Sequence, residues 1–212
     1  MRLVPEYDPV RKLHLCFVQN FFNSRFSYGT AICEIIMAAR RLVEIELLVS
    51  PSDLVFFQNE CDKIGLNLEG VTLNEDSPQR GILAEYAPIF AENEEGKGVG
   101  LVFQNPFLEN RAELKSFSER MTTRLGFETL QTGFEFATTF LLVNEDMVLL
   151  SDRLLMGVDK QEKIRFFEQN FPNQSFHVVP ALAGDVTGDL DMYLWPIAPR
   201  TWIVSEYPPG TV

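Results

Sequence analysis

The sequence predicts an α/β protein assembled from a repeated supersecondary module. Two observations support this prediction: apolar residues are plentiful, and a hairpin, a helix and a strand recur in that order about every 50–70 residues. Of the 212 residues, 46% are hydrophobic and 12% are aromatic, so the chain can bury the core of one compact unit, or at most two. A recurrence of this kind favours modular repeats over a single wound sheet.

The first 65 residues or so read as strand, helix, strand, helix. Short apolar runs predict buried strands at Leu13–Val18 and Val43–Val49, and the helical spacing of apolar residues over Ile32–Ala39 predicts a helix between them. A second helix is expected to begin after Ser50, because its hydroxyl can cap a helix and a proline and an acidic residue follow in the first turn. This helix is expected to end at Gly65.

The rest of the chain continues the pattern, and we expect one domain over 1–212 with modules at 1–65, 66–126, 127–183 and 184–212. The expected strands are 71–73, which begins the second module, then 87–91, 99–103, 139–143, 147–150, 175–179, 192–195 and 201–205, and the expected helices are 110–125 and 159–170.

The stretch 184–207 is the strongest candidate for a site, because Asp185, Asp189 and Asp191 fall within seven positions ahead of an aromatic and β-branched hairpin. With Pro196 and Pro199 confined to the turn, Asp189 and Asp191 are expected at a strand entrance on one face of the sheet. Two carboxylates on one face repel each other and attract a cation. The alternative is an ordinary acidic, solvated loop.

Charge and composition exclude several classes of function. A formal net charge of −12 argues against nucleic acid and favours cationic or neutral small ligands. No apolar run is long enough to span a membrane, and the first residues do not resemble a secretory signal, so a cytoplasmic protein is expected. Cys16, Cys33 and Cys61 lie among apolar residues, which predicts buried, reduced thiols and neither a disulfide framework nor a zinc site.

Common catalytic motifs are missing from the sequence. The glycines of Gly96–Gly100 lie between two expected strands with no helix after them, which is typical of a hairpin turn and not of a phosphate loop. His14 and His177 both fall within expected strands, where we interpret them as structural residues.

Four segments together resemble the agmatine deiminase and bacterial peptidylarginine deiminase family. They are Leu3–Pro9, Glu85–Phe90, Thr139–Leu150 and Thr187–Tyr193, and they occur in the family's order and approximate spacing. The resemblance implies the pentein fold, a five-bladed α/β propeller of ββαβ modules. At this length the chain would hold three to four of the five modules, which makes it an incomplete, C-terminally short member.

The resemblance also implies a guanidinium-binding site with altered residues. Glu85 stands where the family has a substrate-binding aspartate, and Asp191 matches the second guanidinium-binding acid. Asp189 replaces the general acid/base histidine, and Gln131–Gly133 stands in place of a Glu-Gly-Gly segment. The family's nucleophilic cysteine has no counterpart, because no cysteine follows Cys61.

These losses predict a catalytically degenerate relative of guanidino-group deiminases, without a cofactor, that binds a guanidinium or amine or serves as an interaction scaffold. Glu85, Asp189 and Asp191 are the expected ligand-binding residues; Asp185, Arg80 and Trp195 are the secondary candidates. One alternative is a hydrolase with a divalent metal at Asp185, Asp189 and Asp191. Another is an active deiminase completed by a partner chain or a missing C-terminal half. Open sheet edges further predict self-association or closure by another chain.

Overall fold

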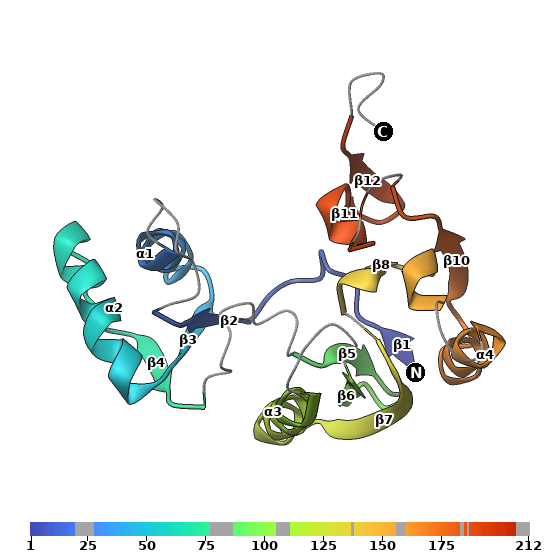
Figure 1. Ribbon diagram of the computed structural model, residues 1–212, viewed down its shortest axis with the longest axis horizontal. Coiled ribbons are helices and arrows are strands. Elements are labelled where there is room, and N and C mark those ends of the chain that lie inside the picture. The colour runs from blue at the N-terminus through green and yellow to red at the C-terminus, as the bar shows by residue number, and fades with distance from the viewer. Residues whose placement is uncertain are drawn as a thin grey trace. The chain divides into compact units, whose positions relative to one another are not determined.

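The protein is described by a computed structural model (Figure 1). It describes residues 1–19, 28–76, 87–104, 111–136, 138–155, 160–182, 185 and 187–206, with the backbone alone for 104, 111–114 and 154–155. The chain divides into two compact units: one combines Met1–Asp8 with Ala84–Val212, and the other is Pro9–Leu83. We name them the large unit and the small unit.

The small unit is a parallel three-stranded sheet with two helices. In chain order its elements are β2 (Lys12–Phe17), α1 (Tyr28–Ala39), β3 (Glu44–Val49), α2 (Pro51–Ile64) and β4 (Val71–Asn74). The strand order is β2-β3-β4, and both pairings are parallel. Its core combines alternate strand residues with one side of each helix, including Ile36, Leu47 and Phe57, which are fully buried.

Local sequence signals set the ends of α2. The Ser50 hydroxyl accepts a hydrogen bond from the backbone N–H of Asp53 at 3.1 Å, which satisfies one of the free donors at the helix start. Gly65 ends the helix in the left-handed conformation, with φ of 70°. The predicted order of strand, helix, strand, helix is therefore confirmed. The prediction that residues 71–73 begin a new module is wrong, because β4 pairs with β3 as the third strand of this sheet.

The large unit contains two successive ββαβ modules. The first is β5 (Ile89–Glu92), β6 (Gly98–Gln104), α3 (Arg111–Arg124) and β7 (Glu128–Glu135), and the second is β8 (Leu141–Asn144), β9 (Met147–Ser151), α4 (Lys160–Asn170) and β10 (Ser175–Val179). In each, the first two strands pair antiparallel and the last strand pairs parallel to the second. The predicted recurrence of hairpin, helix and strand is confirmed in both, although β7 was not expected.

A two-stranded hairpin follows the second module. It consists of β11 (Leu194–Ala198) and β12 (Thr201–Val204), and it is preceded by the short 3-10 helix η4 (Leu190–Met192). Two other short 3-10 helices, η2 (Thr138–Phe140) and η3 (Asp152–Leu155), flank the β8–β9 hairpin. Pro196 pairs with Trp202 inside the hairpin, so the prediction that both prolines lie in its turn is wrong for Pro196.

Buried phenylalanines join the two modules of the large unit. Phe103 and Phe136 stack with ring centroids 4.5 Å apart, and Phe136 also contacts Phe140 and Phe167. These rings come from β6, the end of β7, η2 and α4, and all are nearly inaccessible to solvent. Aromatic contacts of this kind contribute beyond the burial of their area, so both modules share one core. The mixed α/β fold with several sheets agrees with the predicted fold class.

Within the described residues, no helix is both long and apolar enough to cross a bilayer.

Candidate functional site

The N-terminal segment of the large unit is fixed from two sides. Strand β1 (Arg2–Leu3) pairs antiparallel with β5, and the backbone N–H of Val4 extends this contact to Phe90 O at 3.1 Å (Figure 1). On its other side, the side chain of Gln174 accepts from the N–H of Leu3 at 2.7 Å and donates to its carbonyl at 3.2 Å. This anchoring sets the position of Glu6 three residues later.

A cavity of about 250 Å³ lies beside this segment. Glu6 and Thr138 are its polar lining residues. Its apolar walls are Val4, Pro5, Ile89, Phe90, Leu141 and Val143, from the N-terminal segment, β5 and β8. An apolar concavity with a few polar groups is the usual form of a small-molecule site.

Glu6 supplies the carboxyl group of the cavity, and its pKa is raised from 4.5 to about 7. The largest cause is removal of water by the surrounding protein; the negative charge of Asp191 raises the pKa further, and a hydrogen bond from the Val143 backbone opposes the rise. Part of the Glu6 surface is nevertheless exposed. Glu6 is thus surrounded closely enough for its pKa to shift, yet it stays accessible to a ligand.

Asp191 and Asp189 lie at the start of η4. Burial and the neighbouring charge of Asp189 raise the pKa of Asp191. Asp189 precedes the 3-10 helix and accepts a hydrogen bond from the Thr139 hydroxyl, which is fifty positions away in the sequence. The prediction that these two aspartates share one face of a strand entrance is wrong, because both belong to the start of this short helix and not to β11. Asp191, Asp189 and Glu6 nevertheless form one acidic group in which charge on one residue raises the pKa of the next.

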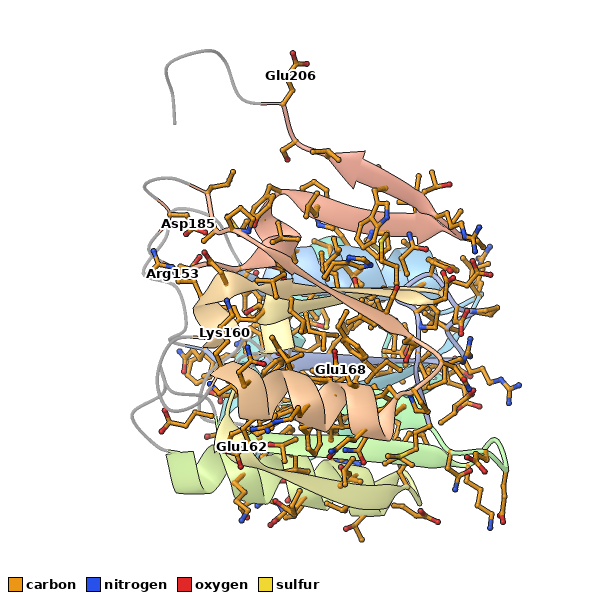
Figure 2. All side chains as sticks on the ribbon, turned by 90° about the vertical axis from the view of Figure 1, so that its right-hand side faces the viewer. Arg153, Lys160, Glu162, Glu168, Asp185 and Glu206 are labelled. Carbon is orange, nitrogen blue, oxygen red and sulfur yellow. The ribbon has the colours of Figure 1, made fainter. Side chains whose placement is uncertain are left out.

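Asp185 stabilises the loop before η4. Its carboxylate accepts from the hydroxyl and backbone N–H of Thr187, at 2.7 and 2.8 Å, and from the N–H of Gly188 at 2.9 Å. Burial alone would raise the pKa of Asp185, but these hydrogen bonds and the charge of Arg153 together lower it. Figure 2 shows Arg153 next to Asp185, where its guanidinium donates to the Asp185 carbonyl at 3.1 Å. The oxygens of this carboxylate are thus engaged within their own loop.

Two other residues that the sequence singled out, Trp195 and Gln131, do not line the cavity. Trp195 is on β11, opposite Ile203, with 38% of its surface exposed, and it does not line the cavity. Gln131, at the position of a family glutamate, donates to Glu119 on the protein surface at 2.8 Å. Glu85 and Arg80 lie outside the described residues.

All three thiols are buried, and those of Cys33 and Cys61 belong to the core of the small unit. The sulfur atoms of Cys33 and Cys61 are 3.6 Å apart, and burial is the main reason that the pKa of Cys33 rises to about 12 and that the pKa of Cys61 rises as well. A thiol of raised pKa is a poor nucleophile at neutral pH. The prediction that all three cysteines are buried is confirmed.

Neither imidazole lines the acidic cavity. His14 Nδ1 lies 2.7 Å from a Glu46 carboxylate oxygen, and Asn74 donates to the other oxygen of Glu46 at 2.8 Å. This arrangement gives His14 a structural role in the β2–β3–β4 sheet. His177 is exposed on β10 and lies within hydrogen-bond distance of Ser175.

In the part of the chain that the structure describes, no three His, Cys, Asp or Glu side chains are grouped so that they could hold a metal ion. Asp185, Asp189 and Asp191 are all among the described residues. The acidic group therefore supplies negative charge for a cation, while an imidazole base and a thiol nucleophile are not part of the cavity lining.

Sequence reasoning missed Glu6. Its segment, Leu3–Pro9, entered the comparison with deiminases only as a whole. The available signal was an acidic residue directly after a buried proline near a predicted strand, which is too common to mark a site. Only the pairing of β1 with β5 brings Glu6 to the cavity.

The fold is similar to that of agmatine deiminases. One solved structure is the agmatine deiminase of Enterococcus faecalis, with a TM-score of 0.76 and 16% identity, and another is a putative agmatine deiminase, with a TM-score of 0.78 and 13% identity. Each similarity covers all of this chain, but 62% and 64% of the respective structures. No protein-family model matches the chain, and no curated protein matches it. The likeness supports the resemblance at the level of the pentein fold.

Proposed function

We propose that the protein is a catalytically degenerate relative of guanidino-group deiminases that binds a small guanidinium or amine cation. Asp189 and Asp191, singled out in the sequence, and Glu6 form the binding group, and Glu85 remains a proposed fourth carboxylate. The observation that carries the proposal is the electrostatic coupling of Glu6 to Asp191 beside an apolar cavity.

The chemistry of the acidic group favours binding over turnover. The charge of Asp191 raises the pKa of Glu6, and the charge of Asp189 raises the pKa of Asp191. A bound cation would relieve this repulsion and lower the cost of ionising the carboxyls together. Deimination of a guanidinium needs a nucleophile and a proton-transfer group, and general acid–base assistance alone is worth roughly 10²–10⁴-fold. None of the three thiols and two imidazoles of the sequence is among the residues that line the cavity.

Isothermal titration with agmatine, arginine, spermidine and simple alkylguanidines tests binding. We expect saturable binding in the native protein. Its affinity should fall at least tenfold when Glu6→Gln and Asp191→Asn are combined, since two charge-assisted contacts are lost. Glu168→Gln is the matched control, because Glu168 is exposed on α4 (Figure 2). A folded protein that gives no heat with any of these cations would overturn the proposal.

The same preparation tests for residual deimination. Ammonia and urea-type products should stay at the background level during incubation with agmatine or a peptidyl arginine. Product release that disappears in Asp191→Asn would instead favour the alternative of an active deiminase completed by a partner chain or a missing C-terminal half.

The alternative of a metal-dependent hydrolase has less support, because the Asp185 carboxylate is engaged by Thr187 and Gly188. Mg²⁺, Mn²⁺ and Ca²⁺ should leave the melting temperature unchanged. A shift that is lost in Asp189→Asn would favour the metal.

The finer architecture is part of the same proposal. The two ββαβ modules and the β11–β12 hairpin are consistent with three to four modules of an incomplete five-bladed propeller. Three free, buried cysteines suit a reducing compartment, which supports a cytoplasmic location.

A further inference from the structure

The distribution of charge around the cavity restricts which cation it accepts. Among the described residues that line the cavity, Glu6 is the ionisable group, while six of the eight are Val, Pro, Ile, Phe or Leu. Thr138 contributes the other polar side chain and carries no charge. One end of the cavity therefore favours positive charge, and its walls favour hydrocarbon.

We infer that the site selects a monocation with an uncharged aliphatic tail over a dication of the same length. This inference rests on the proposed cation-binding function and specifies its ligand class. The charged head lies at Glu6 and Asp191, and the tail packs against Val4, Ile89 and Leu141.

The physical basis is the different cost of burying the two kinds of tail. Each methylene removed from water tightens binding by about fourfold. A terminal ammonium against apolar walls instead loses its hydration without gaining a partner. Agmatine and butylguanidinium share the same guanidinium and the same chain. Only agmatine carries the second charge, so a comparison of the two isolates its effect.

The size of the cavity supports a small ligand. At about 250 Å³, it lies below the range of roughly 300–1,000 Å³ that is common for drug-sized molecules. It suits a short alkyl chain better than a peptide.

The ionisation of Glu6 provides a second readout. A cation binds the ionised carboxylate of Glu6. Binding at a pH near the midpoint of the Glu6 titration should therefore release a proton. The charge of Asp191 raises the pKa of Glu6, the charge of Asp189 raises the pKa of Asp191, and the Val143 backbone donates a hydrogen bond to Glu6. Among the residues that the structure describes, no basic side chain shifts the pKa of the Glu6 carboxyl.

The test is isothermal titration of the intact chain with butylguanidinium, agmatine and the neutral isostere butylurea, above and below the Glu6 midpoint. We expect the affinity for butylguanidinium to exceed that for agmatine by about tenfold or more, and we expect butylurea not to bind. Affinity should rise with pH, and titrations in two buffers of different ionisation enthalpy should reveal proton release.

Two variants locate the effect. Glu6→Gln should weaken the binding of both cations and abolish the proton release. Val4→Thr keeps the β-branched shape and the backbone bond to Phe90, but makes one wall polar, so it should reduce the preference for butylguanidinium severalfold. Circular dichroism confirms that both variants fold.

The outcomes separate this inference from the proposed function. The selectivity would be overturned if agmatine bound as tightly as butylguanidinium, or if Val4→Thr left the preference unchanged. Either result would still agree with the proposed cation site. A folded protein that binds neither cation would overturn both.

Discussion

Gln174 holds the backbone of Leu3 with both ends of its side-chain amide, across 171 positions of sequence. The same amide also donates to the carbonyl of Glu145 at 2.9 Å. Gln174 and Leu3 are both buried. This one side chain therefore links the segment that carries Glu6 to the turn of the second ββαβ module.

Replacing Gln174 by alanine should destabilise the protein. Leu3 N–H and C=O would lose their partners in a buried position, and each unsatisfied group costs about 1–3 kcal/mol. Urea denaturation should show a loss of roughly 2–4 kcal/mol, with Gln169→Ala on the exposed side of α4 as control. A loss below that of the control would show that water satisfies these groups.

Glu6 should make stability depend on pH. Its folded pKa of about 7 lies above the reference value of 4.5, so the folded state binds the proton more tightly than the unfolded state. The stabilising contribution is fully present below 4.5 and is lost as the pH rises through about 7. Denaturation should therefore be measured for the native protein and for Glu6→Gln across this pH window. As the pH rises, the unfolding free energy of the native protein should fall relative to that of the variant.

The coupling to Asp191 gives this prediction an internal check. Asp191→Asn removes a charge that raises the Glu6 pKa, so the midpoint of Glu6, followed by carbon-detected NMR, should move down. An unchanged midpoint would mean that burial alone sets the pKa.

Gly188 should not tolerate a side chain. Its φ is 77°, and an added Cβ would lie 2.1 Å from Cγ of Arg153. Gly133 has nearly the same φ, 76°, with open space around it, so Gly133→Ala measures the backbone strain alone, about 1–2 kcal/mol. Gly188→Ala should lose more stability than this control and should loosen the loop that holds Asp189. Equal losses would contradict steric contact with Arg153.

The thiols should be inert in the native protein. Burial keeps all three from solvent and raises the pKa of Cys33 and Cys61, so a thiol reagent should react slowly until urea unfolds the chain and then titrate all three. Rapid reaction of one thiol without denaturant would show that the small unit opens locally.

Self-association or closure by another chain stays a prediction. The hairpin exposes Trp195 and Ile203 as a cross-strand pair, at 38% and 49% of their surfaces. Sedimentation should show species larger than the monomer, and Trp195→Ser with Ile203→Ser should reduce them. A monomer at all concentrations would contradict the prediction.

Local sequence rules were sufficient for most of the secondary structure. Ser50 and Gly65 mark the ends of α2 as expected, and the strand predicted at 175–179 is β10. The strand β7 was missed because Glu128–Glu135 mixes exposed and buried residues without regular alternation, and its pairing with β6 includes a register irregularity. Pro196 was placed in a turn because proline lacks an N–H, but β11 forms a two-stranded sheet and can accommodate it.

The sequence by itself determined the modular α/β pattern, the acidic character and the placement of all three cysteines within the first 61 residues, because these follow from local periodicity, composition and residue identity. Only the tertiary structure decided which carboxyls act together. Glu6 and Asp191 are far apart in the chain, and the strand pairing and buried side chains that bring them together depend on contacts between distant segments. Asp185 and Asp191 are close in sequence, yet their pKa values shift in opposite directions: burial and the charge of Asp189 raise that of Asp191, whereas hydrogen bonds within the loop and the charge of Arg153 outweigh burial and lower that of Asp185.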